Sequence, residues 1–308
     1  MKKLFGKHKK TQKSILETPT IPTKRLPGSQ ETTKPIMAVA KNQPDEKVEM
    51  ETRQLLASFG QSVGIQRDHN EDTIFTLTTT LSSNETQLPF GLYIVADGMG
   101  GHQHGEIASE VAARTMVEHI TNNLYRHLFS TNSNPPKTPL REMLHNGVQE
   151  AHNAILSRAP GGGTTLTTVI ILDNQMAIAH VGDSRAYTVN PNGRMNAITR
   201  DHSLVKRLEE LGQLTPEEAE IHPQRNVLYR ALGQGEPFEA EIITSPTPDG
   251  YLLICSDGLW GVVSNEALGQ IIKDSPTLSQ ACQTMVAAAN EAGGPDNISV
   301  ILVQLHTQ

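Results

Sequence analysis

The sequence predicts an α+β protein in which layers of helix cover a central antiparallel β-sandwich. Segments with strand and helix patterns come in blocks, in the order β–αα–ββββ–α–ββ–αα–β, and do not alternate strictly along the chain. Very short links join several strand pairs, and they fit antiparallel neighbours because parallel strands need a long crossover. The helix pairs between the strand blocks would then cover the outer faces of the sheets.

The first half of the folded body supplies one of these helix pairs. The body is expected to start near Leu55, and an apolar run over 88–98 predicts a strand. Apolar residues then recur on one face of two segments, about 106–128 and 139–158, which predicts two amphipathic helices. A loop rich in Asn and Pro separates the two helices.

After a run of three glycines the periodicity changes to that of strands. The expected strands are 165–172, 175–181, 186–189, 194–198, 238–245, 251–256 and 297–305. The Asn-Gly pair at 192–193 is interpreted as a hairpin turn. The region of about 200–235 is irregular and partly helical, with a capping box at Thr215. A short helix is expected after the cap Ser264, and a longer one from about 278 to 292.

Charge is unevenly distributed along the chain. Residues 1–50 hold 11 Lys and Arg and 5 Asp and Glu, which gives a net charge of +6. The whole chain has 26 basic and 33 acidic residues, so residues 51–308 hold 15 and 28 of them and have a net charge of −13. Residues 1–52 are rich in Lys, Thr and Pro, so we expect a disordered basic tail before a domain at 53–308. An alternative is that the tail docks to a partner or to a membrane surface.

Composition also bounds the class of protein. The acidic body argues against nucleic acid as a partner. No segment reaches the roughly 18 apolar residues that a transmembrane helix needs, and no apolar signal core follows the basic N-terminus. The two cysteines, Cys255 and Cys282, are interpreted as buried reduced thiols. We therefore expect a cytoplasmic protein.

Short acidic motifs stand where the predicted strands begin or end. Asp97, Asp183 and Asp257 follow apolar runs, and Glu71, Asp72 and Asp296 precede them. For any single motif an ordinary turn is a sufficient explanation, because Asp and Gly favour turns. In an antiparallel sheet, however, the end of one strand lies beside the start of its neighbour, so all six acids could meet at one edge. Carboxylates crowded there would repel one another without cations, which predicts a divalent-metal site suited to attack on a phosphate ester.

Six motifs occur in an order that resembles the metal-dependent type 2C serine/threonine protein phosphatases, especially their bacterial branch. They are Arg67-x-x-Asn70-Glu71-Asp72, Ala96-Asp97-Gly98-Met99-Gly100-Gly101-His102, Gly163-Thr164-Thr165, Gly182-Asp183-Ser184-Arg185, Ser256-Asp257-Gly258 and Gly294-Pro295-Asp296-Asn297. The resemblance covers residues from about 56 to 305. It implies a four-layer α-β-β-α fold, with a central antiparallel β-sandwich flanked by paired helices, in agreement with the predicted element order.

The resemblance implies two Mn²⁺ or Mg²⁺ ions in a core site. Asp97 would bridge the two ions, with the Gly98 carbonyl as a further ligand, and Asp257 and Asp296 would complete the first ion. Hard oxygen ligands of this kind suit these metals. The region 200–235 would be a flap beside the active site.

The resemblance also implies roles for the remaining motif residues. Glu71 would hold the second ion through water, with Asp72 in support. Asp183 would hold a third, weaker ion that it shares with Asp257. Arg67 would bind the substrate phosphate through a charge-assisted fork.

These roles make chemical sense on their own. Two cations that share a water lower its pKa, and the metal-bridging hydroxide would attack phosphorus directly, without a covalent phosphoenzyme. The catalytic residues would then be Arg67, Asp97 and Asp257. Met99 is a departure, because many relatives carry a His general acid at this position and a thioether cannot donate a proton. His102 and metal-bound water are alternatives, so the acid stays unassigned.

The sequence thus predicts a metal-dependent phosphatase of phosphoserine and phosphothreonine in proteins. We expect a monomer that counteracts a bacterial serine/threonine kinase and acts on the phosphoproteins which that kinase produces. A non-enzymatic relative is the first alternative, but it predicts a missing metal ligand and all six acids are present. A phosphoesterase for nucleotides or small phosphates is the second, and a panel of phosphopeptides and nucleotides would separate the two.

Overall fold

The computed structural model describes residues 53–83, 87–100, 103–131, 138–235 and 238–307. The predicted tail, residues 1–52, lies outside the described residues, so its expected disorder and docking role stay predictions. His102 lies outside them as well. In the part of the chain that is described, no helix is both long and apolar enough to cross a membrane.

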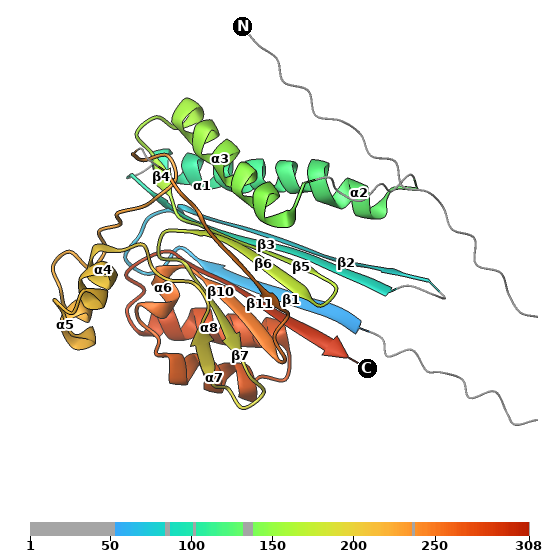
Figure 1. Ribbon diagram of the computed structural model, residues 1–308. Helices are drawn as coiled ribbons and strands as arrows, with labels where there is room; N and C mark the ends of the chain where they lie inside the picture. Colours follow the sequence, from blue (N-terminus) through green and yellow to red (C-terminus); the bar gives the residue numbers. More distant parts are fainter. Residues whose placement is uncertain (1–52, 84–86, 101–102, 132–137, 236–237, 308) are drawn as a thin grey trace, which may run out of the picture. The chain divides into compact units, whose positions relative to one another are not determined.

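The strands form two antiparallel sheets that pack face to face (Figure 1). They are β1 (Arg53–Ser62), β2 (Asp72–Ser82), β3 (Gln87–Met99), β4 (Gly163–Thr164), β5 (Leu166–Leu172), β6 (Gln175–Val181), β7 (Arg185–Val189), β8 (Met195–Ala197), β9 (Glu241–Pro246), β10 (Tyr251–Cys255) and β11 (Ile298–Thr307). One sheet has the order β1-β11-β10-β7-β8, and the other has the order β2-β3-β5-β6-β9, with β4 paired to the end of β3. An aliphatic core fills the space between them, where Tyr93 and Val95 of β3 join the same cluster as Leu252 and Ile254 of β10.

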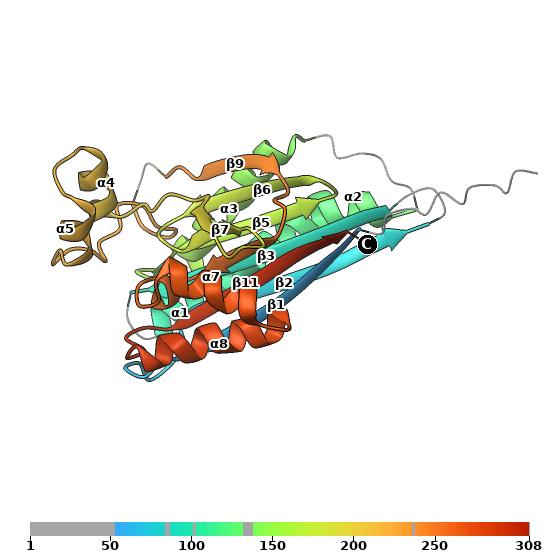
Figure 2. The same ribbon diagram turned by 90° about the horizontal axis from the view of Figure 1, so that it is seen from below.

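Helices cover the outer face of each sheet (Figures 1 and 2). The described helices are α1 (Gln103–Ile120), α2 (Arg126–Phe129), α3 (Leu140–Arg158), α4 (Leu204–Glu210), α5 (Pro216–Glu220), α6 (Asp257–Trp260), α7 (Asn265–Asp274) and α8 (Leu278–Glu291). α1 and α3 share an apolar cluster with β3 and β5, and α7 and α8 share another with β10 and β11. The predicted four-layer α-β-β-α architecture is therefore confirmed.

Three details differ from the predicted elements. Three strands, β1 to β3, precede the first helix, where the predicted block order had one. The helix predicted over 106–128 is interrupted by a π-helical turn, Thr121–Tyr125, which periodicity alone does not reveal. Asp257 opens α6, a helix of four residues that is too short to show a hydrophobic period.

The flap region contains α4 and α5, and its predicted capping box is confirmed. The Thr215 side chain accepts a hydrogen bond from the Glu218 backbone N–H, and the Glu218 side chain accepts one from the Thr215 N–H. Ser264 likewise caps α7 by accepting a hydrogen bond from the Ala267 N–H. These caps fix where each helix begins, because they satisfy backbone donors that have no partner within the helix.

Candidate active site

Strand register places two of the predicted ligands directly opposite each other. Asp72 opens β2, Asp97 lies near the end of β3, and the two residues are partners in the antiparallel ladder. Asp183 follows the end of β6, Asp257 follows the end of β10, and Asp296 stands shortly before β11. We call these five residues the acidic edge.

Mutual repulsion shows that the acidic edge is a single electrostatic cluster. Burial, followed by repulsion from the other four aspartates, raises the pKa of Asp97 well above its ordinary value. Burial and then the charges of Asp257 and Asp201 raise the pKa of Asp183, although Arg185 opposes this. The predicted convergence of these carboxylates at one edge is thus what the fold produces.

Two carboxylate oxygens of the acidic edge are buried without a partner. Asp72 Oδ2 accepts a hydrogen bond of 2.9 Å from Ser256 Oγ, but Asp72 Oδ1 and Asp257 Oδ1 have no hydrogen-bond partner in the described part of the chain. Burial raises the pKa of Asp72 to about 7, although hydrogen bonds from Ser299 and Ser256 lower it. Burial and repulsion by Asp296 raise the pKa of Asp257 to about 6. Orphaned buried oxygens of this kind are points where a hard cation would bind.

Glu71 lies beside the acidic edge and is held by its backbone. Its N–H donates a hydrogen bond of 2.8 Å to Asn297 Oδ1, and Asn297 Nδ2 donates to the carbonyl oxygens of Val63 and His69. The Glu71 carboxylate is nearly buried and lies 3.0 Å from His69 Nε2. Asn297 therefore joins the loop that carries Glu71 to the loop that carries Asp296. The Gly294-Pro295-Asp296-Asn297 motif had not indicated this role for Asn297.

Arg67 points at a carboxylate of the acidic edge. Its Nη2 atom lies 2.7 Å from Asp296 Oδ2, and its Nε donates to the Pro295 carbonyl oxygen at 3.3 Å. The Arg67 side chain is half exposed, so this pair contributes little to stability and can open. The residue predicted to bind phosphate is thus at the site but engaged with a predicted metal ligand.

Close backbone packing explains the glycine next to Asp97. A Cβ atom on Gly98 would stand 2.6 Å from the Glu71 carbonyl oxygen and closer still to that of Gly105. Any side chain would push the end of β3 away from the start of α1 and from Glu71. The missing side chain at Gly98 therefore allows the end of β3, which carries Asp97, to pack closely against the backbone of Glu71.

Gly98→Ala is expected to damage both the fold and the site. Overpacking against two backbone carbonyls costs about 1–3 kcal/mol, which should lower the unfolding temperature by several degrees. Thermal unfolding with and without Mn²⁺ measures this effect, and we expect the stabilisation by Mn²⁺ to shrink as well. An unfolding temperature and Mn²⁺ response equal to those of the wild type would contradict this packing argument.

The donor set of the edge fits hard divalent metals. Its side-chain donors are carboxylate oxygens, two of them orphaned, and such donors favour Mg²⁺ or Mn²⁺ over softer metals. In the described residues, no three Asp, Glu, His or Cys side chains already stand in ligand positions around one point.

Sequence reasoning missed a support behind Asp183. The Trp260 Nε1–H donates a hydrogen bond of 3.0 Å to the Asp183 carbonyl oxygen, and the Arg185 guanidinium stacks on the Trp260 ring at 3.4 Å. Asp201 holds Arg185 through two hydrogen bonds, of 2.9 and 2.7 Å. The Gly182-Asp183-Ser184-Arg185 motif contained this arginine, but nothing in the sequence indicated its partners.

A cavity of about 730 Å³ opens beside the acidic edge. Asp183 and Asp257 line it from the edge, Lys206 lines it from α4, and Trp260 lines it from α6. The flap therefore forms one wall of a cavity that reaches two predicted ligands. Met99, at the position where many relatives carry a His, ends β3 two residues after Asp97 and is half-buried. His102, the alternative general acid, lies outside the described residues.

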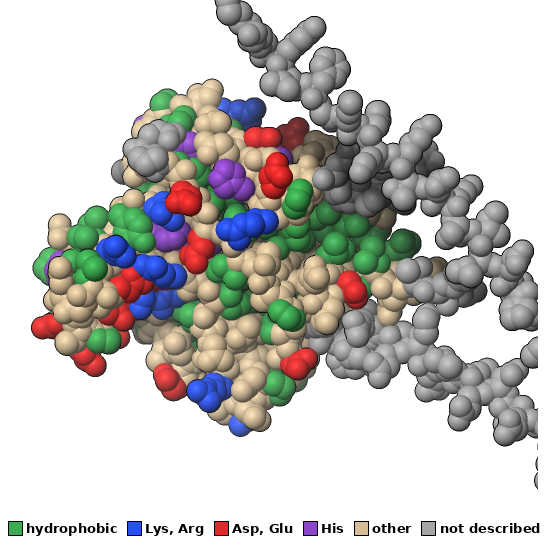
Figure 3. Space-filling view, in the orientation of Figure 1, with side chains coloured by type: hydrophobic (Ala, Val, Ile, Leu, Met, Phe, Trp, Pro, Cys, Tyr) green, Lys and Arg blue, Asp and Glu red, His purple; other side chains and the backbone are tan. Residues whose placement is uncertain are grey.

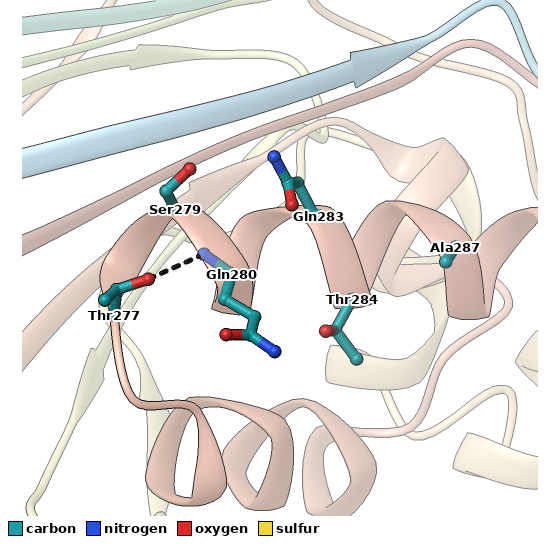
Figure 4. Close-up of a pocket in the computed structure, with 6 residues that line it drawn as sticks. All are labelled: Thr277, Ser279, Gln280, Gln283, Thr284 and Ala287. Carbon is teal, nitrogen blue, oxygen red and sulfur yellow. Dashed lines mark hydrogen bonds between the residues drawn. The ribbon is translucent and has the colours of Figure 1, made fainter.

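A pocket of about 490 Å³ over α8 does not compete as a site (Figure 4). Its lining residues are Thr277, Ser279, Gln280, Gln283, Thr284 and Ala287. None of these side chains is charged, and the Thr277 hydroxyl caps α8 by accepting a hydrogen bond from the Gln280 N–H. The acidic edge is therefore the better candidate for chemistry.

Known proteins are similar to this chain in sequence and in fold. The family model described as protein phosphatase 2C matches residues 60–302. The serine/threonine phosphatase stp of Listeria innocua is 36% identical over 256 residues, which are 80% of this chain and 95% of that protein. The Mycobacterium tuberculosis serine/threonine phosphatase PstP/Ppp superposes with a TM-score of 0.68 at 30% identity, covering 82% of this chain and 99% of that one.

One similar structure also contains metal. The catalytic domain of the serine/threonine phosphatase PstP, solved in complex with two manganese ions, has a TM-score of 0.66 and 28% identity, and the match covers 82% of this chain and 99% of that one. The match to the family model spans most of the chain and includes all six acids of the predicted site. This chain therefore belongs to the protein phosphatase 2C family of serine/threonine phosphatases.

Proposed function

We propose that this protein hydrolyses phosphoserine and phosphothreonine in proteins, with two Mn²⁺ or Mg²⁺ ions at the acidic edge and a third near Asp183. The observation that carries this proposal is the electrostatic cluster itself, in which two buried carboxylate oxygens lack partners. When bound, the ions would act as Lewis acids and lower the pKa of a shared water, so no covalent phosphoenzyme is needed.

The chain's own residues divide into ligands and a phosphate clamp. Asp97, Asp257 and Asp296 would hold the first ion together with the Gly98 carbonyl oxygen, and Asp97 would also reach the second. Glu71 would hold the second ion with support from Asp72. Asp183, which Trp260 and Arg185 hold in place, would bind the third.

Arg67 would change partners when the site fills. With its charge offset by a bound cation, Asp296 would attract the Arg67 guanidinium less, and that fork would become free for a phosphate oxygen. Because the pair is half exposed, little free energy is needed to open it. Arg67 is thus proposed to orient the substrate and to offset charge on phosphorus oxygens.

Arg67→Ala is expected to raise KM for a phosphothreonine peptide about tenfold or more, because it removes one charge-assisted fork. The affinity for Mn²⁺, measured by thermal shift, should stay equal or increase, because the Arg67 guanidinium no longer competes with the metal for Asp296. Steady-state kinetics and thermal shift on the same preparation measure both effects. An unchanged KM would remove Arg67 from the substrate site.

The direct test of the function is release of phosphate from a phosphothreonine peptide by the full chain, with Mn²⁺, with Mg²⁺ and with chelator. We expect release that requires metal and that favours phosphopeptides over nucleotides. Release from nucleotides alone would favour a small-molecule phosphoesterase. No release under any metal from folded protein would favour a non-enzymatic relative.

The last part of the proposal concerns cellular location, oligomeric state and the N-terminal segment. We propose a cytoplasmic monomer that reverses the action of a serine/threonine kinase, and we propose that residues 1–52 contribute to location and not to catalysis. Deleting residues 1–52 should leave hydrolysis of a small phosphoester unchanged within about twofold, since none of the proposed ligands lies there. A large loss of that activity would reject a separable tail.

A further inference from the structure

A second pocket, outside the acidic edge, is lined by arginines. It has a volume of about 440 Å³ and lies where the flap segment meets the start of β9. Its lining residues are Arg200, His202, Arg207, Tyr229, Arg230 and Glu241. On the face shown in Figure 3, Lys and Arg side chains gather where the flap joins the body, with His and acidic side chains beside them. We call this cavity the arginine pocket.

The arginine pocket carries more cations than anions. Arg200 and Arg207 share one carboxylate, Glu210, while Arg230 forms no ion pair within the described part of the chain. Its nearest described aromatic partner is the Tyr229 ring, 5.9 Å from the guanidinium carbon. Glu241 is the one acidic side chain in the lining. Positive charge in excess is unexpected here, because residues 51–308 together have a net charge of −13.

His202 adds no charge to this balance. Its Nδ1 atom accepts a hydrogen bond of 3.1 Å from the Gly182 N–H, so the ring proton is on Nε2, which faces Glu241 Oε2 at 3.6 Å. Burial and repulsion from His180, Arg230 and Arg200 lower the pKa of His202 to about 3. The ring is therefore neutral at physiological pH, and the positive field comes from the arginines alone.

Backbone hydrogen bonds hold the walls of the pocket in place. The Tyr229 N–H donates to the His202 carbonyl oxygen at 3.0 Å, and Leu232 exchanges hydrogen bonds of 2.9 and 3.1 Å with Thr164. Arg230 stands between these two anchors and is half buried. A rigid frame of this kind lowers the entropic cost of ligand binding.

We propose that the arginine pocket binds a phosphate-type oxyanion, either free inorganic phosphate or a second phosphoryl group on the protein substrate. Guanidinium forks match the oxygens of a phosphate in geometry and charge, and the half-buried Arg230 forms no ion pair among the described residues that would compete for its fork. The Gly182–His202 hydrogen bond joins the pocket to the residue before Asp183. The pocket thus lies near the acidic edge in space, but no residue of the acidic edge lines it.

A calorimetric titration tests the site without reference to activity. The full chain, kept free of divalent metal, is titrated with inorganic phosphate, because the metal-free acidic edge repels anions. We expect saturable binding that weakens about tenfold in Arg230→Gln, which removes one charge-assisted contact. Arg207→Gln, on the exposed side of α4, is a second variant in case Arg230 is needed for folding. Arg194→Gln, in the exposed β7–β8 turn, is the matched control.

Peptides then distinguish the two sources of phosphate, and this arm rests on the proposed phosphatase activity. Singly and doubly phosphorylated threonine peptides, in a series of spacings, are compared by kcat/KM with Mn²⁺. A preference for doubly phosphorylated peptides that Arg230→Gln and Arg207→Gln abolish, and Arg194→Gln keeps, assigns the pocket to substrate. Phosphate binding without such a preference assigns it to free phosphate. Absence of phosphate binding, or binding that neither pocket variant weakens, overturns the proposal, whereas loss of all peptide turnover counts only against the proposed function.

Discussion

Asp97→Asn is expected to lower kcat/KM on a phosphothreonine peptide by at least about 10³-fold, because it removes the charge on which both core ions are proposed to depend. Asn has nearly the same shape, and the ladder partnership of residues 72 and 97 uses backbone atoms, so the fold should persist. The Asp97 N–H bond to Thr165 Oγ1, 2.9 Å long, should also persist. The loss would therefore report on metal binding and not on unfolding.

The same substitution should stabilise the metal-free protein. Burial, followed by repulsion from four other aspartates, raises the pKa of Asp97, so removing its carboxylate charge relieves both costs. We expect a higher unfolding temperature than the wild type without metal, together with a smaller rise on adding Mn²⁺. Asp249→Asn, in an exposed turn, is the matched control and should change neither value. Wild-type turnover of Asp97→Asn at modest Mn²⁺ would refute the site.

The location of the acids could be predicted because it depends on local pattern and strand direction. Asp97 and Asp257 follow continuous apolar runs, and Asp296 precedes one, so the alternation of strand direction brings them to one edge. The layer order followed from the blocks of strands and helices for the same reason. Exact register, such as Asp72 opposite Asp97, needed the folded sheet.

Contacts between distant parts of the chain could not be predicted. The Arg67–Asp296 pair joins residues 229 positions apart, and the Trp260–Asp183 bond joins residues 77 apart. Neither has a local pattern, because each depends on how loops from different strands pack. The excess charge of the arginine pocket could not be predicted either, since its residues come from separate segments of the flap, among them α4, and from the start of β9.

Stabilisation of the protein by Mn²⁺ is expected to grow strongly as pH rises. The pKa of Asp72 is raised to about 7 and that of Asp257 to about 6, so protons compete with metal at both carboxylates below neutrality. Protonation of these two carboxylates at pH 6 would therefore weaken the apparent affinity for Mn²⁺ relative to pH 8. Asp97 and Asp183, whose pKa values are also raised, would add to this loss.

In the metal-free protein, the acidic edge should lower the stability of the fold as pH rises, which is the opposite trend. A carboxyl whose pKa is raised by folding contributes stability that is present below its unfolded pKa, and this contribution is lost as pH rises through the folded value. The acidic edge therefore destabilises the metal-free protein increasingly between about pH 4 and 7, as its buried groups ionise. The gap in unfolding temperature between Mn²⁺-loaded and metal-free protein should consequently widen from pH 5.5 to pH 8. Thermal scans at constant ionic strength measure that gap, and a gap that stays constant would mean that the aspartates at this edge do not bind the ion.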